Sequence, residues 1–204
     1  MAIPNNVYFG PENITFGDVR ANDDPLVRMR YLQKRLDSFF IYQIDQLENK
    51  SPFVKAMMCC IAMETLGGIF FKKENNDGQA ALFIKVAAKI DQKLSRPLDK
   101  KFKENYTHQW PEKVKLDANT RAGILYSYLR NTMMHGYYAQ GVYLTDQEGY
   151  TWAEHPGYLT LNPNWLWEQI KIQYNFFISS AINIKNKEIS YRLNALAYIE
   201  DILK

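Results

Sequence analysis

The segment from Phe53 to Phe71 constrains the fold most, because it is apolar on nearly every side. Its length is sufficient to cross a bilayer. Lys55 and Glu64 lie within it, however, and a carboxylate in the middle of a membrane span is costly in hydrocarbon. A helix with no polar face is also typical of the centre of a protein core. We therefore expect residues 53–71 to form the central helix of a bundle, and we expect no membrane association.

Apolar residues at helical spacing predict further helices on both sides of this segment. Asp23 and Asp24 precede Pro25, which is typical of a helix start with an acidic cap and proline in the first turn. The expected helices cover about 25–48, 79–94, 118–136, 163–184 and 187–203. The sequence therefore predicts an all-α protein.

Two segments depart from the helical pattern. Residues 1–24 are rich in proline, glycine and asparagine, which predicts an extended N-terminal arm. After the helix at 118–136, the alternating residues up to about 163, with turn signals at Glu148-Gly149 and Pro156-Gly157, predict a small β-hairpin. Because 204 residues fit one core, we expect a single domain over residues 25–204.

The composition favours a soluble protein without a strong overall field. Hydrophobic residues make up 47% of the chain and charged residues 23%, which suffices for a core. The formal net charge is only +3, so a surface that binds a polyanion must be local. The adjacent Cys59 and Cys60 cannot join distant segments, and the first residues lack a signal-peptide pattern, so we expect a cytoplasmic location.

Common catalytic signatures are missing. The chain lacks GxxxxGK[ST], GxGxxG, GxSxG, HExxH and CxxC. It contains three histidines, His108, His135 and His155, whose spacing does not predict metal ligation. We therefore expect no metal and no cofactor, and structural roles for His108 and His155.

One segment does carry a pattern, Arg130-Asn131-Thr132-Met133-Met134-His135. On an α-helix Asn131 and His135 share a face, whereas Arg130 and His135 are five residues apart and differ by about 140° around the axis. The three side chains meet if the long stem of Arg130 swings round, or if the turn near Gly136 loosens.

This segment resembles the R-N-x-x-x-H motif of the HEPN superfamily, helical domains of which many are metal-independent endoribonucleases. The resemblance extends over about residues 50–137, including the apolar helix that ends at Gly67-Gly68. It implies a HEPN-like helical bundle that forms a homodimer, with a catalytic site composed of Arg130, Asn131 and His135 from both subunits. The implied products are a 2′,3′-cyclic phosphate and a 5′-hydroxyl. The implied context is a toxin–antitoxin pair or phage defence, with an antitoxin or another protein as a candidate partner.

Such a dimer is chemically sufficient for RNA cleavage. The reaction needs a base for the 2′-hydroxyl, an acid for the leaving 5′-oxygen and a cation for the charge on phosphorus. Two subunits supply two histidines and two guanidinium groups, and a guanidinium fork matches phosphate oxygens. Asn131 would orient an imidazole or bind the phosphate.

Other residues have both a functional and a structural interpretation. Glu64 needs a cation, and Arg130 is a candidate partner in a supporting role, although a purely structural ion pair explains it equally well. Tyr137 and Tyr138 are candidates for stacking on RNA bases, or are ordinary interface aromatics. The basic and aromatic stretch 96–115, with Lys113 and Lys115, is either a phosphate contact or a solvated face.

Two other classes of function stay open. The first is a non-catalytic HEPN-like module that binds RNA or protein through the same dimer groove. The second is a helical regulator that binds a small molecule, which requires a closed apolar pocket.

Overall fold

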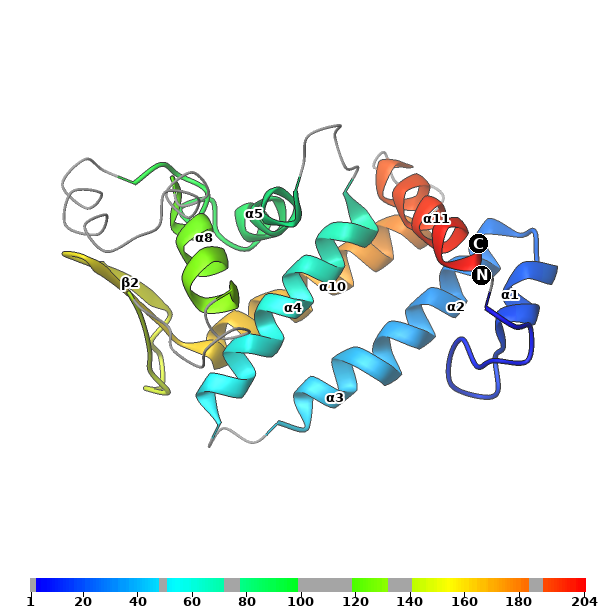
Figure 1. Ribbon diagram of the computed structural model, residues 1–204, viewed down its shortest axis with the longest axis horizontal. Coiled ribbons are helices and arrows are strands. Elements are labelled where there is room, and N and C mark those ends of the chain that lie inside the picture. The colour runs from blue at the N-terminus through cyan, green and yellow to red at the C-terminus, as the bar shows by residue number, and fades with distance from the viewer. Residues whose placement is uncertain (1–2, 48–50, 72–77, 99–118, 132–140, 184–188) are drawn as a thin grey trace. The chain divides into compact units, whose positions relative to one another are not determined.

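The computed structural model describes residues 3–47, 51–71, 78–98, 119–131, 141–183 and 189–204. It is mostly helical and has one small sheet (Figure 1). The chain divides into two compact units. Unit 1 comprises residues 1–46, 68–72 and 174–204, and unit 2 comprises residues 47–67 and 73–173. The mostly helical class agrees with the sequence prediction. The single domain expected over 25–204 stays a prediction.

Unit 1 is built from helices of both chain ends. They are α1 (Phe16–Ala21), α2 (Pro25–Leu36), the π-helical turn η1 (Asp37–Ile41), α3 (Tyr42–Asp45), the second half of α10 (Pro163–Ile182) and α11 (Ile189–Leu203). The Asp24 side chain accepts a hydrogen bond from the backbone N–H of Leu26 at 2.8 Å, as the acidic cap predicted. In the core, the ring of Phe177 lies 5.3 Å from Phe70 and 5.1 Å from Tyr191.

The first 24 residues differ from the expected extended arm. Thr15 and Asp18 form a capping box at the start of α1, with the Asp18 backbone N–H donating to Thr15 Oγ1 at 3.1 Å. Tyr8 and Thr15 pair as an isolated antiparallel bridge. Phe9 is fully buried. The segment is therefore folded into unit 1, because a local capping signal and aromatic burial outweigh its proline and glycine content.

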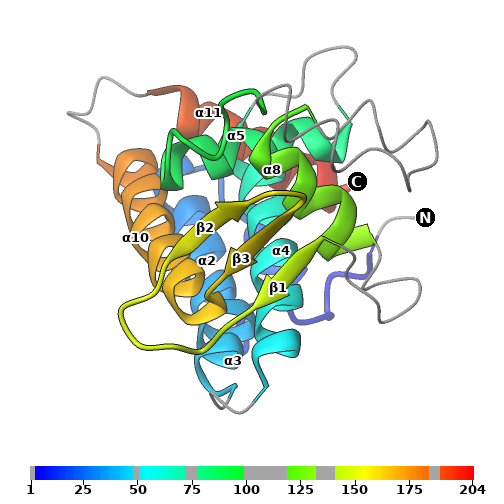
Figure 2. The same cartoon turned by 90° about the vertical axis from the view of Figure 1, so that its left-hand side faces the viewer.

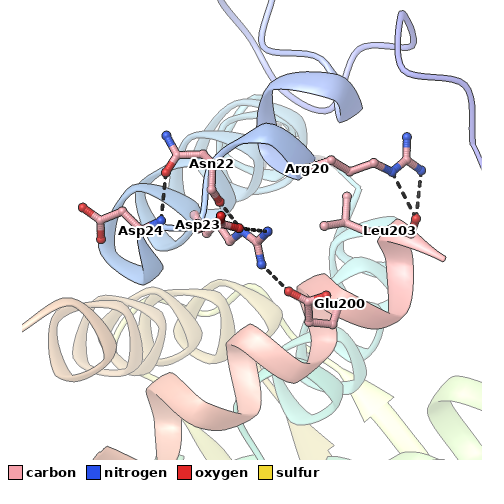
Figure 3. A network of polar contacts seen from close by, with 7 residues as sticks. Arg20, Asn22, Asp23, Asp24, Glu200 and Leu203 are labelled. Atoms are coloured by element: carbon pink, nitrogen blue, oxygen red, sulfur yellow. Dashed lines mark hydrogen bonds and ion pairs between the residues drawn. The ribbon is translucent and has the colours of Figure 1, made fainter.

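Arginines join this N-terminal segment to α11 (Figure 3). The Arg20 side chain donates to the carbonyl of Leu203 through Nε at 3.2 Å and Nη2 at 2.8 Å. Arg28 bonds the carbonyl of Asn22 at 2.5 Å and forms an ion pair with Glu200. Because Leu203 ends α11, the Arg20 contact satisfies a carbonyl that the helix leaves without an internal partner.

Unit 2 combines helices with the sheet. Its helical elements are the first part of α4 (Pro52–Phe70), α5 (Gln79–Ile90), α8 (Arg121–Ile124), the π-helical turn η3 (Leu125–Asn131) and the first half of α10. The sheet contains β1 (Val142–Leu144), β2 (Trp152–His155) and β3 (Tyr158–Leu161). Strand β3 lies in the middle, antiparallel to β2 and parallel to β1 (Figure 2).

The sheet extends the predicted hairpin. Strands β2 and β3 form that hairpin, and Gly157 in its turn has a φ of +88°. The parallel pairing of β1 with β3 was not predicted, because it joins residues about seventeen positions apart and has no local turn signal.

Helix α4 has the apolar surroundings expected of a core helix. It is the one helix among the described residues with the length and composition of a membrane span, and 56% of that span is buried inside the structure. Ala62, Met63 and Leu66 are fully buried. Lys55 is also buried and donates to Asn164 Oδ1 at 2.8 Å, so its ammonium has a polar partner. These surroundings are consistent with a soluble protein.

Gly67 allows a close approach between α4 and α5. A Cβ added there would lie 2.8 Å from the backbone oxygen of Leu82, whereas a Cβ at Gly68 would meet nothing within 4 Å. The Gly67-Gly68 pair therefore has one position that packing requires to be glycine, and one that it does not.

Candidate functional site

The structure describes only part of the predicted site. Glu64 lies on α4, Arg130 lies in η3, and Asn131 is the last residue of η3. The remaining candidates, His135, Tyr137, Tyr138, Lys113 and Lys115, lie outside the described residues. The site is accordingly built from Glu64 and Arg130 and their neighbours in unit 2.

Glu64 and Arg130 form a two-pronged ion pair. Arg130 Nε lies 2.9 Å from Glu64 Oε1, and Arg130 Nη2 donates to Glu64 Oε2 at 3.2 Å. The Arg130 side chain is 27% exposed and the Glu64 side chain 14%, so solvent screens the pair only in part. Arg130, the candidate cation for Glu64, is thus its ion-pair partner in the structure. Its geometry holds the guanidinium plane in one orientation.

The ring of Tyr126 also contacts this guanidinium. The Arg130 Cζ lies 5.7 Å from the centre of the Tyr126 ring, which is a cation–π distance. The Tyr126 ring in turn packs edge-on against Phe83 of α5, with 5.4 Å between the ring centres. Aromatic pairs in proteins typically lie about 4.5–7 Å apart. Arg130 is therefore positioned by contacts to α4 and to its own helical turn, which itself packs on α5.

A buried thiol lies within electrostatic reach of the pair. Cys60 is fully buried one helical turn before Glu64. Burial raises the pKa of the Cys60 thiol far above its ordinary value, the negative charge of Glu64 raises it further, and Arg130 opposes the shift. The thiol stays protonated at neutral pH and is unsuited to nucleophilic chemistry.

The turn that carries Arg130 is π-helical. In η3 the backbone bonds run from residue i to i+5, which widens the helix and brings residues about five apart toward one face. Such turns are frequent at functional sites. A loosened turn near Gly136 was one of two predicted ways to bring Arg130 toward His135. The loosened turn that the structure describes lies earlier, over residues 125–131.

Of the three histidines, His155 alone lies within the described residues, and it is part of the sheet. His155 ends β2, and its ring stacks on Tyr158 at 4.6 Å with an angle of 14° between the planes. Within the described ranges, no group of three or more His, Cys, Asp or Glu side chains is placed to hold a metal ion.

A polar cleft was missed by the sequence analysis. It has a volume of about 370 Å³ and lies between the turn after α5, the start of α8 and β2. Its lining includes Asp91, Lys93, Arg96, Arg121, Trp152 and Glu154. Arg96 had been noted as the start of a basic stretch, but no local pattern joins it to Trp152, which lies 56 positions further along the chain.

Comparison with known proteins adds no relative from which a function could be inferred. The chain matches no protein-family model, no curated protein and no solved structure.

Proposed function

We propose that the protein is a metal-independent endoribonuclease of the HEPN type. The observation that supports this most is the fixed orientation of Arg130, the first residue of the R-N-x-x-x-H motif, by Glu64. A cation that is held in place before substrate arrives stabilises developing negative charge without reorganisation during the reaction. The π-helical turn at the start of the motif adds to the support.

In this proposal Arg130 contacts the scissile phosphate. The guanidinium carries five N–H groups in a planar fork, and two of its nitrogens face Glu64. Glu64 acts as a positioning residue that sets the direction of this fork. Asn131 binds the phosphate or orients an imidazole.

His135 supplies the proton transfers. One imidazole takes the proton of the 2′-hydroxyl, whose oxygen attacks phosphorus, and a second imidazole gives a proton to the leaving 5′-oxygen. The products are a 2′,3′-cyclic phosphate and a 5′-hydroxyl. Since each chain has one motif histidine, the proposal includes a homodimer in which both subunits contribute Arg130, Asn131 and His135.

The proposed setting is cytoplasmic, with no metal or cofactor. An uncontrolled endoribonuclease harms its own cell, so the proposal includes a toxin or phage-defence role and a protein partner such as an antitoxin. Tyr137, Tyr138, Lys113 and Lys115 are the proposed RNA contacts beyond the catalytic residues.

Cleavage assays in EDTA test this function. Purified protein is incubated with tRNA, mRNA and structured RNA, and the His135→Ala variant is compared with His155→Ala as a matched control. We expect the wild type and His155→Ala to cut RNA and His135→Ala to lose activity by at least a hundredfold. Full cleavage by His135→Ala contradicts the assignment of that residue. Binding of RNA without any cleavage by the wild type favours the non-catalytic module instead.

A further inference from the structure

The cleft beside β2 has the charge distribution of an anion-binding groove. Its two carboxylates are engaged within the cleft itself. Asp91 Oδ2 accepts a hydrogen bond from Trp152 Nε1 at 3.0 Å, and Glu154 forms an ion pair with Arg121. The Arg121 guanidinium also lies 3.4 Å from the carbonyls of Arg96 and Pro97. These contacts pair Asp91 with Trp152 and Glu154 with Arg121 along the lining of the cleft.

Two exposed cationic side chains line this cleft and form no ion pair with a described carboxylate. Lys93 and Arg96 lie in the turn that follows α5, and both are exposed. Among the described residues neither side chain has an ion pair. Asp91 fixes their turn, because its Oδ1 accepts the backbone N–H of Lys93 at 2.8 Å. The cations are therefore held at a defined place on unit 2 with their charge available to a ligand.

Strand β2 supplies an aromatic side chain to the cleft. Trp152 on β2 is part-exposed and lines the cleft, with its indole N–H directed at Asp91. The hydrogen bond to Asp91 restrains the position of the ring. Paired cations with one fixed aromatic ring are the elements by which proteins bind single-stranded nucleic acid, through phosphates and a stacked base.

Arg121 connects this cleft to the proposed catalytic residue. It begins α8, which continues directly into η3 and Arg130, nine residues later. Both lie in unit 2.

We propose that the cleft is a binding site for single-stranded RNA that flanks the cleaved bond, with Lys93 and Arg96 on phosphates and Trp152 against a base. The inference rests on the proposed function for the identity of the nucleic acid, but not for the binding itself. It makes Lys93, Arg96 and Trp152 contributors to affinity rather than catalytic residues.

A binding titration tests this site separately from catalysis. A fluorescent 12-nucleotide oligo(U) is titrated with full-length protein in the His135→Ala background, so that the ligand stays intact, and the dissociation constant is measured at several salt concentrations. The Lys93→Ala/Arg96→Ala variant is compared with Arg30→Ala/Lys89→Ala, which removes the same two residue types from exposed positions outside the cleft. Circular dichroism and thermal unfolding confirm that both variants are folded.

We expect the cleft variant to bind at least tenfold more weakly near 0.1 M salt. We also expect its plot of log K against log[salt] to be shallower by about 1.4, since each phosphate contact to a single strand contributes about 0.7. Trp152→Leu should weaken binding about fivefold or more with little change in that slope, because stacking involves no counterion release. The control variant should match the parent.

The outcomes separate this proposal from the proposed function. Equal affinity and equal slope for the cleft variant and its control overturn the cleft, even if the wild type cleaves RNA. Absence of any oligo(U) binding also overturns it. Cleft-dependent binding by a wild-type protein that never cuts RNA supports the cleft and counts against the endoribonuclease.

Discussion

Glu64 and Arg130 are 66 residues apart in the chain and meet as an ion pair in which two nitrogens face two oxygens. The pair links α4, the most apolar of the described helices, to the turn at which the R-N-x-x-x-H segment begins. Two interpretations of Glu64 were open from the sequence, a structural partner and a support for catalysis. They differ in what substitutions do to stability and to RNA cleavage.

Removing either partner should destabilise the fold, because it leaves a mostly buried charge without its counterion. We expect Glu64→Ala to lower the free energy of unfolding by about 1–3 kcal/mol. Chemical denaturation of Glu64→Ala, Arg130→Ala and the double variant measures the coupling. A double variant that loses as much stability as the two single changes added together contradicts a direct interaction.

In the catalytic interpretation, the planar shape of the Arg130 guanidinium matters as well as its charge. Arg130→Lys keeps the positive charge but loses the planar fork that Glu64 orients. If Arg130 contacts the phosphate, this variant should cleave RNA at least tenfold more slowly while its stability falls less than that of Arg130→Ala. Unchanged cleavage by Arg130→Lys would leave the ion pair with a structural role alone.

Adjacent glycines in α4 should respond in opposite directions to alanine. In Gly67→Ala the new methyl group meets the backbone of Leu82, which has no side-chain freedom to yield, so we expect a loss of about 1–3 kcal/mol. In Gly68→Ala the methyl group enters open space and alanine favours the helix, so stability should rise by up to about 1 kcal/mol. Thermal unfolding of both variants checks this, and equal effects would contradict the close approach of α5.

Both cysteines should resist thiol reagents in the native protein. Burial raises the pKa of the Cys59 and Cys60 thiols, and Cys59 Sγ also lies 3.7 Å from the carbonyl of Pro163. At pH 8 we expect no alkylation by iodoacetamide on the timescale at which urea-unfolded protein reacts fully. Native-state reaction at the unfolded rate would show that the α4 core opens readily.

The capping box of α1 should contribute to stability only above acidic pH. Hydrogen bonds from the backbone and hydroxyl of Thr15 lower the pKa of Asp18, so its folded value lies below its unfolded one. This contribution is present above the unfolded pKa and is lost as pH falls through the folded pKa. As the pH is lowered from about 5 to 2, the free energy of unfolding should therefore fall less in Asp18→Asn than in the wild type.

A matched control isolates the capping effect from a change in net charge. Asp146→Asn removes an exposed carboxyl that makes no hydrogen bond within the described part of the chain. Its melting temperature should follow the wild-type pH dependence. An Asp18→Asn profile that is parallel to this control would contradict the capping role.

Much of the helical fold was predictable from the sequence, because apolar spacing reports directly on which face of a helix is buried. The helix expected at 53–71 is observed at Pro52–Phe70, and that expected at 163–184 at Pro163–Ile182. The expected helix at 25–48 is observed as α2 and α3, with η1 between them. A π-helical turn has no sequence signature of comparable strength, since packing decides it.

The candidate site was predictable only where chemistry forces a contact. Glu64 needed a cation because it lies in an apolar helix, and Arg130 was a candidate for that partner. The cleft of Lys93, Arg96 and Trp152 was not predictable, because it depends on the turn after α5 meeting a β-strand far along the chain. Residues that meet only through the tertiary fold have no characteristic spacing in the sequence.

The chemistry of the RNA ends tests the central claim most directly. Wild-type protein and His135→Ala are incubated with a defined RNA in EDTA, and the new ends are identified by mass spectrometry. The account predicts 2′,3′-cyclic phosphate and 5′-hydroxyl ends from the wild type, and none from His135→Ala. The same ends produced at the same rate by both proteins, or no cleavage by the wild type of any RNA class, would contradict it.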